Sequence, residues 1–412
     1  MAIKKVKTKL LRPGMFVDRF DRNWLETPFF TKSVMIKNDG MITKILEMGI
    51  HEVFIDTAKG DDVSDAPTLE EAHAESTKSV QKIAAEPVAP IVGATFVEEI
   101  KRAVPIRNEA VKVMTTAMRS IRDGQKVDQN SMAPLVDDLV ESIYNNSNAM
   151  LCLNRIRDRD SYTFQHSVSV CTLTTAFGKH LNLPKNASKH IAVGALLHDL
   201  GKMYIPNEVL NKPDKLTPAE FDIMKSHVLQ AKKAFKDYDS ITAAAESVIM
   251  QHHEKYDGSG YPYRLKGEEI SQIGLMGAIV DVYDALTADR VYHAGMSPTE
   301  ALRKLYDWGK YHFKMELVEQ FIKCVGIYPS GTLVALTGGF VGVVLEPSTK
   351  GSIRPKIRIV FDSKKTLSVK PFDLDLSDDN NLVYGEITRV EKPGAFGINP
   401  MEHLLQGLGV GL

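Results

Sequence analysis

The middle of the chain limits the possible folds more than any other part. Residues 160–325 form a succession of apolar segments with helical spacing and show little strand signal. Two of these segments begin with clear helix-start signals. "TPAE" at 217–220 and "SPTE" at 297–300 each place a hydroxyl residue before a proline, with a glutamate three positions after the hydroxyl. This centre therefore predicts a core of packed helices rather than a sheet.

The two ends of the chain have a different pattern. Residues 1–60 mix short alternating runs with one helical pattern, "MITKILEMGI", which predicts a small α+β module. Residues 61–94 are polar, acidic and rich in alanine and proline, which is typical of a linker that is partly helical or disordered. From about Pro329 onward, β-branched segments punctuated by glycine predict a small β module.

These patterns predict a multidomain, mainly α protein. The expected divisions are a regulatory module at 1–60, a linker at 61–94, a helical connection at 95–150, a central all-helical domain at 151–328 and a β module at 329–412. The length of 412 residues fits this division, because domains usually contain about 100–200 residues.

Composition narrows the class of protein. The formal net charge is -1, which favours neither a nucleic-acid polymer nor a membrane as a partner. The three cysteines form no CxxC pair, so a disulfide framework is not expected and the cytoplasm is the predicted location. The sequence also lacks a signal-peptide pattern and a stretch of about 20 apolar residues that could span a bilayer.

Histidines and aspartates gather at the ends and inner faces of the central helical segments. The histidines with this placement are His166, His198, His227, His252 and His253. Two aspartates join them. Asp199 follows His198 in "ALLHDLGK", and Asp281 lies in the apolar run "GLMGAIVDVYDAL", where an unpaired carboxylate would be costly.

This combination indicates a metal site. Imidazole and carboxylate ligands without a thiolate suit Fe, Mn, Zn or Ni. An aspartate can bridge two metals about 3.5–4 Å apart, an arrangement used in phosphoester hydrolysis, and Asp199 is the best candidate for the bridge. The alternative for any single histidine is a satisfied core residue, but that explanation fits the whole set poorly.

The order of these motifs resembles a known superfamily. His166, the His198–Asp199 pair and Asp281 follow the order found in the HD superfamily of metal-dependent phosphohydrolases. Together, "HDLGK", the lone His227, "HHEKYDGSGYP" and "DVYDALTADRVY" resemble the HD-GYP family of bacterial cyclic-dinucleotide phosphodiesterases. The resemblance covers about residues 155–325, and the flanking modules are similar to those of one HD-GYP subgroup.

The resemblance implies two divalent metal ions, with Fe or Mn favoured and Ni or Zn as alternatives. It assigns the first metal to His166, His198, Asp199 and Asp281. It assigns the second metal to His227, His252 and His253, with Asp199 as the bridge.

The resemblance also implies a set of substrate contacts. Lys202 would neutralise a substrate phosphate, and Arg290 would contact the second phosphate or a guanine. A signature loop that shapes the pocket would consist of Gly260, Tyr261 and Pro262. The alternatives are that Lys202 caps helix carbonyls and that Arg290 forms a surface ion pair.

Four further residues are expected to have supporting or ordinary roles. Asp257 should hold its turn through hydrogen bonds to the backbone, and Asp284 should orient a histidine rather than bind metal. His51 and His73 in the N-terminal part are expected to be ordinary surface residues.

The sequence departs from the family's pattern at two places. Family members that hold a third metal carry a glutamate four residues before the first histidine, where this chain has Tyr162, so two metals are expected. The family's arginine motif usually continues with proline and a distal cation, where this chain has Val291 and His293. The second departure predicts a weaker or pH-dependent phosphate contact.

The implied reaction is hydrolysis of a cyclic dinucleotide to the linear dinucleotide by a water that bridges the metals, and a second cycle could give mononucleotides. Cyclic di-GMP is the favoured substrate and 3′3′-cyclic GMP-AMP is the alternative. Two other functions remain open. One is a cyclic-dinucleotide-responsive signalling protein that does not hydrolyse its ligand. The other is an HD-type hydrolase of mononucleotides, which the complete "DGSGYP" loop disfavours. Protein partners and self-association are undetermined.

Overall fold

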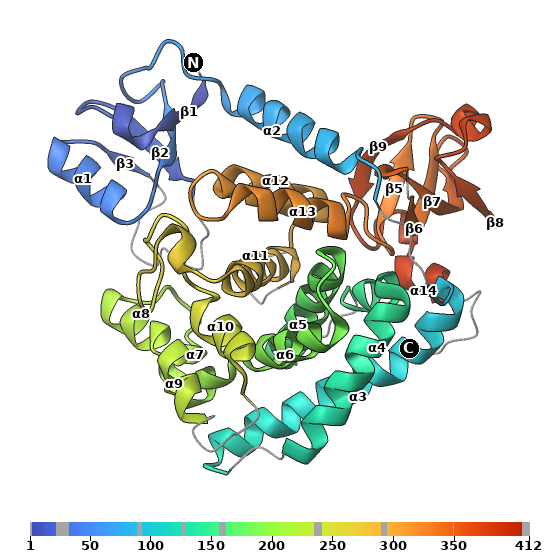
Figure 1. Cartoon of the computed structure of the whole chain (residues 1–412). Helices are drawn as coiled ribbons and strands as arrows, with labels where there is room; N and C mark the ends of the chain where they lie inside the picture. Colours follow the sequence, from blue (N-terminus) through green and yellow to red (C-terminus); the bar gives the residue numbers. More distant parts are fainter. Residues whose placement is uncertain are drawn as a thin grey trace.

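The computed structural model describes residues 2–21, 33–88, 93–125, 129–155, 162–234, 241–289, 295–348 and 350–405. Figure 1 shows a central body of helices with a small sheet at each end of its upper side. The fold is mainly helical, as the sequence predicts. In the described part of the chain, none of the helices combines the length and apolar composition that crossing a membrane requires.

The N-terminal sheet contains four antiparallel strands in the order β1-β4-β2-β3. Their bounds are Ile3–Lys7 for β1, Phe16–Phe20 for β2, Val34–Met35 for β3 and Glu52–Asp56 for β4. Helix α1 (Asp39–Glu47) begins where the side chain of Asn38 accepts a hydrogen bond from the backbone of Met41. This module has its own hydrophobic core, separate from that of the rest of the chain, formed by Val6, Leu11, Met15, Val17, Ile36, Ile45, Ile50, Val53 and Ile55.

Helix α2 (Leu69–Ala84) connects this module to the rest of the molecule. A capping box between Thr68 and Glu71 starts the helix, which runs along α12 and α13 from one sheet to the other (Figure 1). Its buried face includes Val80 and Ile83. The stretch expected to be a partly helical or disordered linker therefore contains a packed helix of 16 residues, because its sparse apolar residues fall on one face.

Two long helices form a hairpin beneath the central body. Helix α3 (Phe96–Arg122) starts at a capping box between Thr95 and Glu98, and α4 (Gln129–Leu153) packs along it. Helix α4 is interrupted at Asn146, whose backbone has φ -156° and ψ 100°. The Asn146 side chain then donates to Ala94 O, which fixes the kinked helix to the chain just before α3.

The central helices surround α11 (Gln272–Thr287), whose residues are all buried from Gly274 to Leu286. The two capping boxes that the sequence predicts are present at the starts of α8 and α12. The other helices of this region are α5 (Tyr162–His180), α6 (Lys185–Leu197), α7 (Asn207–Leu210), α8 (Pro218–Lys225), α9 (His227–Ala234), α10 (Ala243–Gln251), α12 (Pro298–Gly309) and α13 (Met315–Val325). Short 3-10 turns lie at Thr8–Leu10, Leu200–Tyr204 (η3), Gly267–Glu269, Asp379–Tyr384 and Ala395–Gly397.

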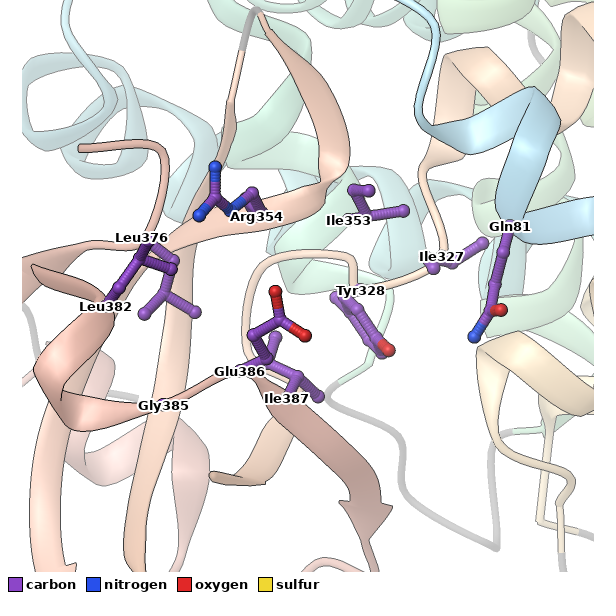
Figure 2. Close-up of a pocket in the computed structure, with 10 residues that line it drawn as sticks. All are labelled: Gln81, Ile327, Tyr328, Ile353, Arg354, Leu376, Leu382, Gly385, Glu386 and Ile387. Atoms are coloured by element: carbon purple, nitrogen blue, oxygen red, sulfur yellow. The ribbon is translucent and has the colours of Figure 1, made fainter. Parts of the chain in front are cut away.

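The C-terminal sheet has five antiparallel strands in the order β8-β7-β6-β5-β9. The strands are β5 (Leu333–Leu336), β6 (Phe340–Ser348), β7 (Gly351–Asp362), β8 (Leu367–Asp375) and β9 (Ile387–Glu391), and helix α14 (Pro400–Leu405) follows. Unlike the N-terminal module, this sheet shares one hydrophobic core with the helices. A cavity of about 230 Å³ lies where α2 meets the sheet, with Gln81, Tyr328, Arg354 and Glu386 among its lining residues (Figure 2).

Candidate metal centre

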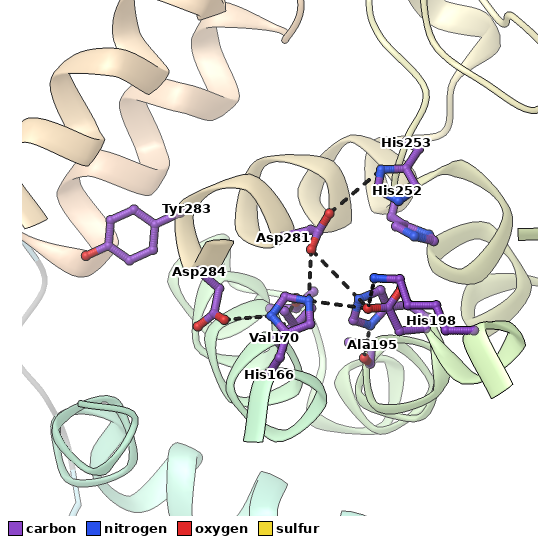
Figure 3. A network of polar contacts seen from close by, with 12 residues as sticks. His166, Val170, Ala195, His198, His252, His253, Asp281, Tyr283 and Asp284 are labelled. Atoms are coloured by element: carbon purple, nitrogen blue, oxygen red, sulfur yellow. Dashed lines mark hydrogen bonds and ion pairs between the residues drawn. The ribbon is translucent and has the colours of Figure 1, made fainter. Parts of the chain in front are cut away.

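The structure brings together all seven residues that the sequence marks as metal ligands. Most of them lie at helix ends. His198 and Asp199 follow α6, His227 begins α9, and His252 and His253 follow α10. The other two project from helix interiors, His166 from α5 and Asp281 from α11 (Figure 3).

The first cluster contains His166, His198 and Asp199, whose ligand atoms lie within 4.8 Å of one another. Asp199 Oδ2 lies 3.6 Å from His166 Nε2 and 3.5 Å from His198 Nε2. Asp281 adjoins this cluster, since its Oδ1 is 3.1 Å from His166 Nε2 and 3.8 Å from His198 Nε2 (Figure 3). These four residues are those that the resemblance assigns to the first metal.

The second cluster contains Asp199, His227, His252 and His253, again within 4.8 Å. Here Asp199 uses its other oxygen, because Oδ1 lies 3.5 Å from His227 Nε2. One carboxylate thus faces both clusters, with Oδ2 toward the first and Oδ1 toward the second. An aspartate that bridges two metal ions needs this arrangement.

Hydrogen bonds at Nδ1, on the side of the ring away from the centre, orient four of the histidines. Three of them contact the carbonyl oxygen three residues earlier, at the end of a helix: His198 with Ala195 O at 2.8 Å, His227 with Met224 O at 2.7 Å and His252 with Ile249 O at 2.9 Å. A carbonyl oxygen only accepts hydrogen bonds, so each Nδ1 carries the proton and Nε2 presents a lone pair to the centre. Helix-end carbonyls lack intrahelical partners, which makes them available for this role.

The atoms that face the centre fit a cation. Within the described ranges, His198 Nε2, His227 Nε2, His252 Nε2 and Asp199 Oδ1 are buried without a hydrogen-bond partner. Unsatisfied buried polar atoms are costly, and metal ligation would satisfy all four. Two ligand atoms bound about 2.0–2.2 Å from one ion lie about 3–3.5 Å apart, close to the separations seen here. Neither cluster contains a cysteine among the described residues, so the donors are imidazole and carboxylate.

The protonation states also suit metal binding, with one exception. Burial lowers the pKa of His227 to about 4 and that of His252 to about 3, so both are neutral at pH 7. Burial would raise the pKa of Asp199, but the opposing effects, of which the charge of Lys202 is the largest, hold that pKa well below its usual range. Burial also acts to lower the pKa of His166, yet Asp281 and Asp284 raise it to about 9. A metal must therefore displace a proton from His166.

Asp284 contacts a histidine, as its predicted orienting role requires. Its Oδ2 lies 2.7 Å from Nδ1 of His166, and the side chain is fully buried (Figure 3). Because the contact is on the far side of the ring, Asp284 orients His166 Nε2 toward the cluster without approaching it. This is the common second partner of a metal-binding histidine.

Residues 257–262, which are the turn at Asp257 and the signature loop that follows it, lie beside the second cluster and are together called the signature loop below. The ring of Tyr261 stacks on His253, with 4.7 Å between ring centroids and 29° between planes. Asp257 Oδ1 accepts hydrogen bonds from Ser259 N at 2.9 Å and Ser259 Oγ at 2.7 Å, as its predicted role in the turn requires. At the edge of the centre, Lys202 Nζ donates to Asp199 Oδ2 at 2.6 Å, and its side chain is 25% exposed.

Other predicted contacts cannot be placed. Arg290, Val291 and His293 lie outside the described residues. Of Tyr162, the structure describes only its position as the first residue of α5.

The prediction that His51 is an ordinary surface residue is wrong. Its Nε2 lies 2.6 Å from Asp257 Oδ2, across the boundary between the N-terminal module and the signature loop. His73 is also half-buried and meets the edge of Phe54. The sequence analysis did not predict the structural role of Glu254. This buried residue accepts hydrogen bonds from Tyr263 N at 2.7 Å and Leu265 N at 3.1 Å. The position of Glu254 directly after the candidate ligands His252 and His253 was a signal in the sequence for its role.

Comparisons with known proteins agree with this architecture. The HD domain family matches residues 150–317, and a domain of unknown function, DUF3391, matches residues 3–132. "Cyclic di-GMP phosphodiesterase PA4108" of Pseudomonas aeruginosa is 34% identical over 375 residues, which is 91% of this chain and 89% of the relative. "3'3'-cGAMP-specific phosphodiesterase 1" of Vibrio cholerae is 36% identical over 158 residues, 37% of this chain and 36% of the relative.

Among solved structures, Bd1817, a HDG"Y"P protein from Bdellovibrio bacteriovorus, is similar with a TM-score of 0.46 and 17% identity. The similarity covers 77% of this chain and 98% of that chain. The family assignment rests on the Pseudomonas aeruginosa relative, which matches 91% of this chain, and on the two family models. The chain belongs to the HD-GYP family of HD-domain proteins, in the subgroup that carries an N-terminal DUF3391 module.

Proposed function

We propose that this protein is a metal-dependent phosphodiesterase that hydrolyses a cyclic dinucleotide, with cyclic di-GMP as the first candidate and 3′3′-cyclic GMP-AMP as the second. The observation that carries the proposal is the placement of Asp199, whose two oxygens face two separate histidine clusters in one buried centre. The names of relatives that act on either nucleotide support the choice of substrate class.

The proposed centre holds two divalent metal ions, Fe or Mn, with Ni or Zn as alternatives. His166, His198, Asp199 and Asp281 would hold one ion, and Asp199, His227, His252 and His253 would hold the other. When bound, the two ions supply an activated water and stabilise negative charge on the phosphoryl oxygens. Tyr162 in place of a carboxylate supports two ions rather than three.

The side chains of the protein then have separate tasks. The carbonyl contacts at Nδ1 keep His198, His227 and His252 in the tautomer that binds metal. Lys202, at the exposed edge of Asp199, is placed to move from that carboxylate to a substrate phosphate, where its charge would stabilise the transition state. Gly260, Tyr261 and Pro262 would shape the pocket, and Arg290 would bind the second phosphate.

The same proposal covers the organisation of the chain. The divisions 1–60, 61–94, 95–150, 151–328 and 329–412 would separate a regulatory module, a linker, a helical connection, the catalytic domain and a β module. A cytoplasmic location is part of the proposal, because a cyclic dinucleotide messenger is made and degraded in the cytoplasm. The three cysteines also form no CxxC motif or disulfide framework.

Product analysis tests this function. Protein reconstituted with Mn or Fe(II) is incubated with cyclic di-GMP and, separately, with 3′3′-cyclic GMP-AMP, and the products are separated by chromatography. We expect the linear dinucleotide to form first, and the double variant His198→Ala/Asp199→Ala to form none. His190→Ala is the matched control, since His190 is a half-buried histidine of α6 outside both clusters.

The outcomes also separate the alternatives. Binding of a cyclic dinucleotide without cleavage under Mn, Fe and Ni would favour a ligand-responsive signalling protein. Cleavage of mononucleotides but not of cyclic dinucleotides would favour an HD-type nucleotide hydrolase. Metal analysis that finds one or three ions per chain would contradict the two-metal centre.

A further inference from the structure

The N-terminal module touches the signature loop at one defined place. His51, which lies just before β4, donates from Nε2 to Asp257 Oδ2 at 2.6 Å, a short distance typical of a hydrogen bond to a charged acceptor. The two residues are 206 positions apart in the sequence. Asp257 uses its other oxygen within the loop, where Oδ1 accepts from Ser259. The carboxylate therefore joins the module to the loop.

Three neighbouring contacts fix His51 and the segment that carries it. The His51 ring stacks on Tyr311, with 4.4 Å between centroids and 18° between planes. His312 donates from Nε2 to Gly49 O at 2.9 Å. Gly49 has φ +71°, and a Cβ at this position would collide with Ser259 of the loop. The backbone of the module thus lies directly against the signature loop, at a position where only glycine fits.

The contact continues to the metal centre in a few steps. His51 donates a hydrogen bond to Asp257, and Asp257 accepts another from Ser259. Two residues later, Tyr261 stacks on the metal-ligand candidate His253, with 4.7 Å between ring centroids. Tyr261 N also donates to His253 O at 3.1 Å. A displacement of the loop at Asp257 would therefore change the position of Tyr261 and the pocket wall that it forms.

Polar contacts also join the module to α12. The module has its own hydrophobic core. Lys5 Nζ pairs within the module with Asp21 at 3.0 Å and with Glu52 at 2.8 Å, and it lies 3.7 Å from Asp307 of α12. Trp308 of α12 donates to Asp21 at 3.2 Å. Contacts of this polar kind between domains allow relative motion more readily than a shared apolar core does.

We infer that His51 is a positioning residue for the signature loop, so that the docked N-terminal module sets substrate binding in the catalytic domain. The inference rests on the proposed function and adds a regulatory role for the module. His51, Asp257 and His312 also lie close enough to hold a metal. A hydrogen bond explains the geometry better, because His312 Nε2 already donates to Gly49 O and the His51–Asp257 distance is that of a direct bond.

The test compares His51→Ala, His51→Gln and Asp257→Asn with wild type and with His73→Ala. His73 is a half-buried histidine that meets Phe54 and not the loop, so its variant is the matched control. In His51→Ala we expect KM for cyclic di-GMP to rise about tenfold, the scale of one lost charge-assisted hydrogen bond, with kcat nearly unchanged. His51→Gln keeps a terminal N–H and should recover much of the loss. Asp257→Asn removes the charge of the acceptor, so it should weaken the bond. His51→Ala/Asp257→Asn should resemble His51→Ala, because the donor of that bond is already absent.

Hydrogen exchange supplies a readout that does not depend on activity. In metal-loaded protein, His51→Ala should speed amide exchange in residues 257–265, whereas His73→Ala should not. If wild type cleaves no cyclic dinucleotide but this exchange pattern is found, the proposed function fails and the positioning role stands. Unchanged KM and unchanged exchange in His51→Ala would overturn the inference. Loss of one metal ion per chain in the same variant would also overturn it, since the cluster would then be a metal site.

Discussion

Nδ1 of His166 lies 2.7 Å from Oδ2 of Asp284, one helical turn beyond the ligand candidate Asp281 on α11. Helix α11 therefore places the carboxylate of Asp281 beside Nε2 of His166 and the carboxylate of Asp284 beside Nδ1 of the same ring. Both carboxylates raise the pKa of His166 against the effect of burial. Helix α11 thus orients His166 and raises its basicity.

The first prediction concerns this contact. Asp284→Asn should weaken metal binding by about 10–100-fold, because the orienting charge behind His166 is lost. Competition with a chromogenic chelator measures the affinity. Asp362→Asn is the control, since Asp362 is buried in the β module and accepts from backbone N–H groups outside the centre. Equal affinities in Asp284→Asn and wild type would show that His166 is oriented by packing alone.

The second prediction concerns metal removal. Chelation should lower the melting temperature, because the metal-free centre leaves buried ligand atoms unsatisfied. A free metal concentration of 100 times Kd stabilises the folded state by about 2.7 kcal/mol. Calorimetry with and without chelator measures the shift. His227→Ala should reduce it and His190→Ala should not; a shift of the same size in both variants would place the stabilising ion elsewhere.

The third prediction concerns Gly201 in "HDLGK". A Cβ at this position would collide with the backbone of His227 and Ala231, where η3 packs on α9. Backbone atoms cannot move aside cheaply, so Gly201→Ala should lower the free energy of unfolding by about 1–3 kcal/mol or more. Urea denaturation measures the change. Gly40→Ala, in the exposed first turn of α1, brings a Cβ to 3.3 Å from the side-chain oxygen of Asn38 and meets no backbone, so its loss should be much smaller. Equal losses in the two variants would contradict the argument.

The fourth prediction concerns pH and the boundary of the N-terminal module. Burial would raise the pKa of Asp21, but Lys5 outweighs it and lowers that pKa below the ordinary value of 3.8. A lowered folded-state pKa means that the ion pair stabilises the protein above about pH 4 and that this contribution is lost as pH falls through the folded-state pKa. Melting temperatures between pH 7 and pH 3 measure the loss.

The melting temperature of Asp21→Asn should be lower than that of wild type at pH 7. It should also fall less steeply as the pH is lowered, since the variant has no carboxyl group to protonate at this position. Asp62→Asn is the control. It removes a pair with Lys4 on the same module, but Asp62 is 48% exposed and such a pair contributes little. Parallel acid profiles for wild type and Asp21→Asn would contradict the prediction.

Much of the candidate centre could be predicted from the sequence because the placement of its histidines depends on local structure. His198, His227 and His252 each lie at a helix end, where the carbonyl three residues earlier fixes the ring. Helix ends are marked locally by caps, glycines and the end of an apolar run, so the sequence predicted both the helices and the histidines that follow them. Asp284 was predicted as an orienting residue for the same reason, since it lies one turn from Asp281.

The sequence by itself determined the helical class, the two capping boxes and the turn at Asp257, all of which depend on residues a few positions apart. Only the tertiary structure decided which oxygen of Asp199 faces which cluster, the packing of α2 along α12 and α13, and the bond between His51 and Asp257. These relationships join segments far apart in the chain. They follow from how whole helices and modules pack, and a local pattern such as the one around His51 carries no signal of its distant partner.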